Sequence, residues 1–308
     1  MKEYLSEEAF QKATKFIQGS GRYLERSIYD YRFRNKKPGD VFTALKDYQN
    51  PDGGFGHGLG PDLRAPTSTP IATTQAFQKL EEFNEKEVDS DLVKDGIGYL
   101  EKTFNPDQNR WFAASKEVND YPHSPWWHYD EEREGTVIDE YWGNPTAEII
   151  GYLQKYDGFL QDLDPDSLVE EALDRLAAKE EYNSEHEIYC FLRLYRALPS
   201  DQAKELESHL TNAVQSLVVK TPAEWSEYVP KPLDFVKSPE EYRFGISGDL
   251  LETNLDFLIE TLEDQGVIRP TWEWGQYQDE WERAKQEWTG VLTLEALTLL
   301  KRFNRIRL

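Results

Sequence analysis

Apolar and small residues recur at helical spacing along most of the chain. Strand-like alternation is scarce, so the sequence predicts an all-α protein. Ser6, followed by Glu7 and Glu8, predicts a helix cap and an acidic first turn that suits the helix dipole. Thr69-Pro70 predicts another start, with proline in the first helical position. The helices are expected at about 6–18, 39–49, 69–84, 90–103, 144–156, 165–180, 184–197, 200–218, 249–264 and 290–304.

The connections between these helices carry a repeat of their own. The string "NPDGGF" at Asn50–Phe55 recurs as "NPDQNRW" at Asn105–Trp111 and, more loosely, as "DQGVIRPTWEWG" at Asp264–Gly275. Each string ends a helix, and a helix rich in small and apolar residues follows. The first and last of these helices align, with Thr73 opposite Thr293. Helix, aromatic turn and helix in units of roughly 40–55 residues predict stacked helical hairpins.

The first copy of the turn resembles a known repeat. The stretch "YQNPDGGFG" is similar to the glutamine/aromatic repeat of squalene–hopene cyclases and protein prenyltransferase β-subunits, in which a glutamine ends an outer helix and a Gly-aromatic turn leads to an inner one. The resemblance implies an (α/α) toroid of about five to six helical hairpins. No Gly/Ser-rich linker divides the chain, so we expect one domain over residues 1–308. The residues expected to build the structural turn are Gln49, Asp52, Gly53, Gly54 and Phe55.

The catalytic residues of that group have no clear counterpart here. The strings "VDSD" at 88–91 and "DLDPD" at 162–166 lack the spacing of the Asp-x-Asp-Asp acid of the cyclases. Cys190 has no Asp-x-Cys element around it, which the prenyltransferase zinc site requires. The string "DEERE" at 130–134 has the spacing of a diphosphate-binding Asp-Asp-x-x-Asp motif but lies in a loop-like region. Because such toroids also host polysaccharide lyases, hydrolases and complement-type domains, the fold leaves the activity open.

Composition narrows the classes of partner. The net charge is −23, from 58 acidic against 35 basic residues, and this disfavours nucleic acid, which needs a basic face. No stretch approaches the ~18 apolar residues of a membrane span. The first residues contain no apolar run of signal-peptide length. We therefore expect a soluble, cytoplasmic protein whose partner is a small molecule, and no particular cofactor is indicated.

The stretch just beyond the turn, "HGLGPDLRAP", carries candidate chemistry. His57, Asp62 and Arg64 lie in it, and it leads to the helix start at Thr69. Loops at the rim of a toroid face the central cavity, and a helix N-terminus favours anions. Arg64 could bind a carboxylate or phosphate through two hydrogen bonds, so all three are candidate substrate-binding residues. Alternatively, Asp62 and Arg64 only brace the loop.

A second candidate segment is the long, irregular connection at 105–143. Its stretch "YPHSPWWHYDEE" is too aromatic for disorder, and long loops of this kind are often functional. His123, His128 and Asp130 are candidate acid–base residues; they could also bind a metal ion, although their spacing matches no metal motif. Trp126 and Trp127 either form a wall against the substrate or pack the segment on the core as a lid.

Tryptophan is concentrated in two connections. Eight of the nine lie at 111–142 and 272–288, which favours an aromatic-lined cavity. Such a lining stabilises carbocations or stacks on sugar rings, so we expect an enzyme acting on an isoprenoid-like or carbohydrate molecule, specifically with lyase or glycoside hydrolase activity in the second case. A non-catalytic module that binds a ligand or peptide is the alternative. Glu148, Trp272 and Trp274 complete the candidate substrate-binding set, and Glu273 is a further carboxylate at the rim.

Overall fold

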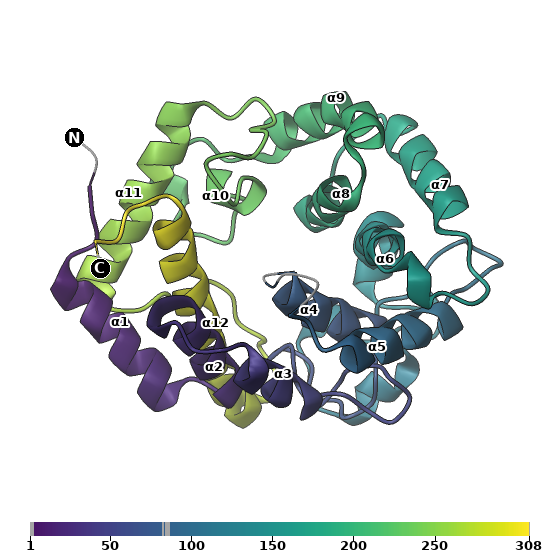
Figure 1. Ribbon diagram of the computed structural model, residues 1–308, viewed down its shortest axis with the longest axis horizontal. Coiled ribbons are helices and arrows are strands. Elements are labelled where there is room, and N and C mark those ends of the chain that lie inside the picture. The colour runs from purple at the N-terminus through teal and green to yellow at the C-terminus, as the bar shows by residue number, and fades with distance from the viewer. Residues whose placement is uncertain (1–2, 82, 84–86, 308) are drawn as a thin grey trace. The chain divides into compact units, whose positions relative to one another are not determined.

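The computed structural model describes residues 3–81, 83 and 87–307. Within these ranges the chain forms α-helices, short 3₁₀ turns and isolated β-bridges, but no strand. None of the described helices is both long and apolar enough to cross a membrane. The helices labelled in Figure 1 are α1 (Glu7–Ser20), α2 (Tyr23–Arg34), α3 (Gly39–Lys46), α4 (Pro70–Leu80), α5 (Ser90–Lys102), α6 (Gly143–Lys155), α7 (Pro165–Ala177), α8 (Glu185–Ala197), α9 (Ser200–Leu217), α10 (Pro232–Phe235), α11 (Gly248–Gln265) and α12 (Gln278–Arg302).

The prediction of an all-α protein is confirmed, and several helix starts agree with their capping residues. The Ser6 hydroxyl accepts a hydrogen bond from the backbone N–H of Ala9 in α1. Thr69 caps α4 in the same way, and Pro70 occupies the first helical position. The predicted residues 82 and 84 of this helix lie outside the described residues.

Other helix boundaries differ from the prediction. The structure contains α2 and the short α10, which the apolar pattern does not reveal. It also begins α12 at Gln278 rather than near residue 290. The added turns are rich in charged residues and tryptophan, so they carry no continuous apolar stripe. α3 ends at Lys46 instead of continuing to residue 49, because the chain turns before Asn50-Pro51.

The described chain divides into two compact units. Unit 1 contains Met1–Ala44, Leu217–Glu273 and Gln278–Leu308, and unit 2 contains Leu45–Ser216 and Trp274–Tyr277. In unit 1, α1 packs against α2, α11 and α12. In unit 2, α6 packs mainly on α8 and also contacts α4 and α7, as Figure 1 illustrates for α6 and α8.

Burial separates inner from outer helices in unit 2. Every residue of α6 from Gly143 to Leu153 is buried. By contrast, α7 buries one stripe, which consists of Leu168, Val169, Ala172 and Leu176. That spacing is typical of a helix with one face in water. Helix α6 is therefore an interior element, and α7 covers it.

The aromatic turns share a contact with a buried threonine. The backbone N–H of Phe55 donates to Thr73 Oγ1 in α4 at 3.1 Å. In the second copy, the N–H of Trp111 donates to Thr146 Oγ1 in α6, also at 3.1 Å. Phe55, Trp111 and both threonines have no exposed surface. Each turn is thus tied to the start of the helix that follows it.

The third copy has the same contact but a different residue in the aromatic position. There the N–H of Ile268 donates to Thr293 Oγ1 in α12 at 2.9 Å. Gly266 caps α11 with φ +73°, so the turn begins directly after that helix. The residue that corresponds to Phe55 is therefore Ile268, which lies ahead of Trp272 and Trp274.

Candidate functional site

The turn after α3 is held by Gln49. Its side-chain amide donates to the carbonyl oxygens of Gly53, at 3.0 Å, and of Leu92 in α5, at 3.2 Å. Gly53 has φ +92°, and a Cβ atom there would lie 2.2 Å from the carbonyl oxygen of Asp95. Only glycine fits both the backbone conformation and this close approach.

Asp52 and Phe55 complete the turn. Asp52 Oδ1 accepts hydrogen bonds from the N–H of Gly54, at 3.0 Å, and from the hydroxyl of Ser68, at 2.7 Å. Phe55 points into the interior and is fully buried. The five turn residues are engaged with one another, with α5 and with the start of α4.

His57 lies beside this turn. Its Nε2 atom is 2.8 Å from Oδ1 of Asn50, and its backbone N–H donates to the carbonyl of Ala65. The side chain is exposed, and the backbone has φ +56°. The structure therefore places His57 with the turn rather than with the other candidate histidines.

Asp62 and Arg64 join the first candidate loop to the second. Asp62 is buried, and its Oδ1 atom accepts a hydrogen bond from Trp274 Nε1 at 2.6 Å. Its backbone carbonyl accepts from the N–H of Ser124 at 2.9 Å. The N–H of Arg64 donates to the carbonyl of Pro122 at 3.0 Å. These contacts fix the segment that carries His123.

His123 and His128 form a hydrogen-bonded pair. His123 Nε2 lies 3.2 Å from His128 Nδ1, and the two ring planes are inclined by only 19°. Between them runs a short 3₁₀ helix, η2 (Pro125–Trp127), which turns the chain so that the two imidazoles meet. His123 is buried, whereas His128 is exposed.

The neighbours of the pair determine its tautomers. His123 Nδ1 lies 2.6 Å from the carbonyl oxygen of Tyr121. A carbonyl can only accept, so this nitrogen carries the proton and Nε2 of a neutral His123 is an acceptor. His128 must then donate through Nδ1–H. Neutral His128 consequently keeps its lone pair on Nε2, the nitrogen that faces away from the pair.

The environment keeps His123 neutral. Burial lowers the pKa of His123, and the neighbouring His128 lowers it further, while the carbonyl of Tyr121 acts in the opposite direction. A neutral His123 can accept the hydrogen bond from a protonated His128. In the neutral pair, His128 is therefore the donor and His123 the acceptor of the hydrogen bond between the two rings.

Asp130 lies close to the pair and stabilises the following turn. Its Oδ1 atom accepts the backbone N–H groups of Glu132, at 2.8 Å, and Arg133, at 2.9 Å. The Arg133 hydrogen bond is the main reason that the pKa of Asp130 is lowered, and the charge of His128 contributes to the same shift. Asp130 is thus an ionised carboxylate near His128, with two hydrogen bonds that belong to the loop.

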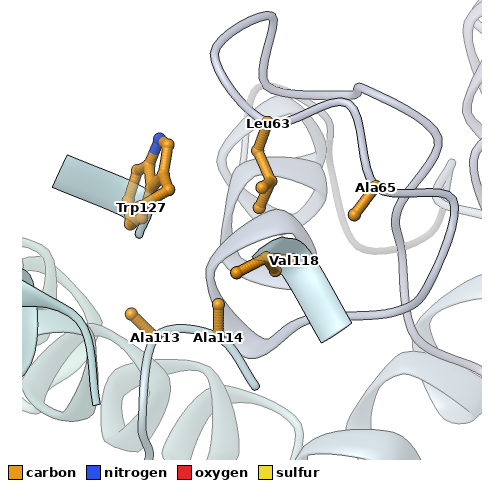
Figure 2. Packing of buried hydrophobic residues seen from close by; sticks show 6 residues of the cluster. All are labelled: Leu63, Ala65, Ala113, Ala114, Val118 and Trp127. Carbon is orange, nitrogen blue, oxygen red and sulfur yellow. The ribbon is translucent and has the colours of Figure 1, made fainter. Parts of the chain in front are cut away.

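Trp127 lies between the two histidines in sequence and packs into the interior. It belongs to a buried cluster that joins the two candidate loops, and partly buried residues such as Trp126 and Tyr121 pack against that cluster. Figure 2 shows the six members: Leu63, Ala65, Ala113, Ala114, Val118 and Trp127. Trp127 therefore anchors the second loop, while Trp126 lies at the edge of the cluster.

A short segment far along the chain completes the site. Trp274–Tyr277 belongs to unit 2, where Trp274 binds Asp62. The Gln276 side chain donates to the carbonyl of His123 at 2.8 Å. The Tyr277 ring lies 5.7 Å from the His123 ring. Gln276 and Tyr277 lie in the stretch 271–288 that the sequence places at the rim of the site, but neither is named as a candidate residue there.

Trp272 has a different environment from Trp274. It lies in unit 1, where its ring makes edge-to-face contacts with Tyr228, at 5.5 Å, and Trp288, at 5.2 Å, between ring centroids. Glu273 also belongs to unit 1. Sequence proximity to Trp274 therefore does not place either residue in the histidine site.

Glu148 is the centre of another polar cluster, formed by α4, α6 and α8. Its Oε1 atom accepts hydrogen bonds from Tyr152 (2.6 Å), Gln78 (2.8 Å) and Arg193 (3.0 Å). Burial raises the pKa of Cys190, whose sulfur lies 3.6 Å from Glu148 Oε2. Burial alone would lower the pKa of Arg193, but the Glu148 carboxylate raises it. This cluster joins three helices of unit 2 by charge and hydrogen bonds.

Among the described residues, no three histidine, cysteine, aspartate or glutamate side chains are grouped so that they could hold a metal ion. Comparisons with protein-family models, with curated proteins and with solved structures find no match for this chain. The geometry of the histidine pair is therefore the main guide to what the protein does.

Proposed function

We propose that this protein is an enzyme that acts on a small molecule, with His128 Nε2 as its proton acceptor. The observation that carries the proposal is the hydrogen-bonded order Tyr121 carbonyl, His123, His128. In this order the exposed His128 keeps a lone pair on Nε2, and His123 accepts a hydrogen bond from the other nitrogen of the same ring. A base held in one tautomer by a second group is the arrangement that general base catalysis uses.

The proton would follow a short path. A substrate O–H or acidic C–H gives its proton to His128 Nε2, and the resulting imidazolium strengthens its Nδ1–H bond to the neutral His123. The nearby Asp130 carboxylate stabilises the same positive charge. His123 and Asp130 are positioning residues in this scheme, because they act through His128.

A carbohydrate suits this site better than an isoprenoid. An imidazole base would remove a proton from a carbocation prematurely, whereas lyases abstract a C–H proton and glycoside hydrolases activate a water molecule during their reactions. The Tyr277 ring, 5.7 Å from the His123 ring, can stack on the sugar. The proposed activity is therefore of the polysaccharide lyase or glycoside hydrolase kind.

We also propose that the helices form a single (α/α) toroid over the whole chain. The support comes from three turns with one threonine contact each, at Thr73, Thr146 and Thr293. A further support is that the alternate helices α4, α6 and α8 pack in sequence. A low-angle scattering profile of the intact protein would test it, because two independently placed units and a closed ring differ in their radius of gyration.

The enzymatic proposal is tested by substituting the base. Wild-type protein and the His128→Gln variant are assayed for turnover of uronate oligosaccharides, neutral oligosaccharides and prenyl diphosphates, and binding of the same compounds is measured by calorimetry. We expect turnover of one oligosaccharide by the wild type and a loss of about 100-fold or more in the variant, with affinity retained. His57→Gln is the matched control, since this histidine is exposed but lies at the turn.

Two outcomes would contradict the proposal. Equal turnover by wild type and His128→Gln would show that the pair is not the base. Binding of an oligosaccharide without any turnover would instead favour the non-catalytic ligand-binding module.

A further inference from the structure

Tyr277 combines an unusual backbone with an exposed ring. Its φ is +48°, a left-handed conformation that residues other than glycine, asparagine and aspartate rarely adopt. Such a conformation costs about 1–3 kcal/mol and persists only where neighbouring contacts impose it. The residue is nevertheless 45% exposed, so packing in the interior does not explain the conformation.

Two hydrogen bonds hold the segment just before Tyr277, one at Trp274 and one at Gln276. Trp274 is fixed by its hydrogen bond to Asp62, and Gln276 by its hydrogen bond to the carbonyl of His123. Gly275 between them has φ +69°. Gly275 and Tyr277 therefore both have left-handed backbone conformations, and the Tyr277 ring lies beside His123.

We propose that Tyr277 is the specificity-determining residue of the histidine site and binds a six-membered ring of the substrate against its exposed face. The Tyr277 and His123 ring planes are inclined by 52°. The Tyr277 ring therefore lies beside the His123 ring and is not stacked on it. A pyranose or aryl ring against the exposed face of Tyr277 lies next to the exposed His128. The inference rests on the proposed role of His128 as the reactive base.

The test uses two probes that react with the same nitrogen and differ in whether they carry a ring. In 4-nitrophenyl acetate, His128 Nε2 attacks the ester carbonyl, 4-nitrophenolate leaves, and water hydrolyses the acyl-imidazole to acetate and free imidazole. In diethyl pyrocarbonate, the same nitrogen attacks a carbonyl and forms the N-carbethoxy product, while the leaving ethyl carbonate breaks down to ethanol and carbon dioxide. Second-order rate constants are measured for both.

The variants separate the ring from the backbone. Tyr277→Asn removes the ring but tolerates the left-handed conformation, and Tyr277→Phe keeps the ring. We expect Tyr277→Asn to slow the reaction with 4-nitrophenyl acetate by about 2- to 10-fold, the value of one aromatic contact. Its reaction with diethyl pyrocarbonate should stay unchanged, and Tyr277→Phe should behave as wild type with both probes.

Each contrary result has its own meaning. If Tyr277→Asn leaves both rates unchanged, or slows both equally, Tyr277 is not a ring-binding residue and this inference is overturned, although His128 remains the base. If His128→Gln leaves both rates unchanged, the reactive histidine itself was wrongly assigned, and the proposed function fails with it.

Discussion

The backbone N–H of Phe55 and the hydroxyl of Thr73 are joined by a hydrogen bond of 3.1 Å in which both residues are completely buried. The threonine hydroxyl also donates to the carbonyl of Thr69, the N-cap of α4, at 2.8 Å. One side chain therefore satisfies the turn and the helix start at once. Because a buried N–H without an acceptor is costly, this residue links the glycine turn to the stability of the fold.

Replacing each turn threonine by valine should destabilise the protein by about 1–3 kcal/mol, because the shape is kept and one N–H, buried at Phe55 and Trp111 and partly buried at Ile268, loses its acceptor. The positions are Thr73, Thr146 and Thr293. Denaturant unfolding measures the effect, and the threonine-to-serine variants, which keep the hydroxyl, should cost less. Valine variants as stable as wild type would show that these hydrogen bonds do not stabilise the turns.

Two glycines should respond to alanine with opposite signs. Gly53→Ala should destabilise the protein by about 1–3 kcal/mol or more, because the position has φ +92° and the new Cβ atom meets the carbonyl of Asp95. Gly98→Ala, inside α5, meets no atom within 4 Å and should stabilise by about 0.5–1 kcal/mol. Thermal or denaturant unfolding of both variants gives the comparison; a stable Gly53→Ala variant would contradict the account of the turn.

The sequence was sufficient for most helices because caps and apolar stripes are local features. Ser6 and Thr69 each indicate a helix start, because a capping residue can be recognised from the few residues that follow it. Helix α2 was not predicted because it is rich in aromatic and charged residues. Which of them are buried depends on packing against α1 and α12, which the sequence does not show. The first turns of α12 were not predicted for the same reason.

The site was only partly predictable. His123 and His128 are five positions apart in a loop, so their meeting depends on the turn made by η2, which no periodicity describes. Trp274 and Asp62 are separated by 212 positions, and composition alone cannot pair them. Trp272, two residues before Trp274, belongs to unit 1 and packs on Trp288, so the sequence alone does not say which of the two tryptophans contacts Asp62.

The ion pair of the buried Glu148 with Arg193 should contribute more to the free energy of unfolding than the exposed pair of Glu171 with Arg175. Glu148→Gln removes a buried carboxylate from Arg193, whose side chain is 24% exposed, so the expected cost of about 1–3 kcal/mol is smaller than that of a fully buried pair. The double variant Glu148→Gln/Arg193→Met should recover part of that loss. In the control Glu171→Gln, the pair with Arg175 is exposed on α7, and a cost of about 0.3–0.5 kcal/mol is expected. Equal losses at the two sites would contradict the buried assignment of Glu148.

Stability should depend on pH through His123. Its pKa is lowered in the folded protein, chiefly by burial, so the unfolded chain, with a histidine pKa near about 6.5, takes up the proton first as pH falls. The contribution is fully present above the unfolded pKa and is lost as pH falls through the lower folded pKa. Unfolding free energies measured from about pH 8 to about pH 5 should therefore fall less steeply for His123→Asn than for wild type. An unchanged slope in His123→Asn would refute the assignment.

The tautomers of the histidine pair can be observed directly. Because the Tyr121 carbonyl can only accept, neutral His123 must hold its proton on Nδ1. Its Nε2 atom is then an acceptor, so His128 must also hold a proton on Nδ1. Long-range proton–nitrogen correlation spectra of the five histidines distinguish Nδ1–H from Nε2–H rings by the shift of the unprotonated nitrogen. In the neutral pair we expect the Nδ1–H form for both rings. An Nε2–H form of His123 would reverse the direction of the hydrogen bond, and His128 Nε2 would then carry the proton in the resting state and could not serve as the acceptor.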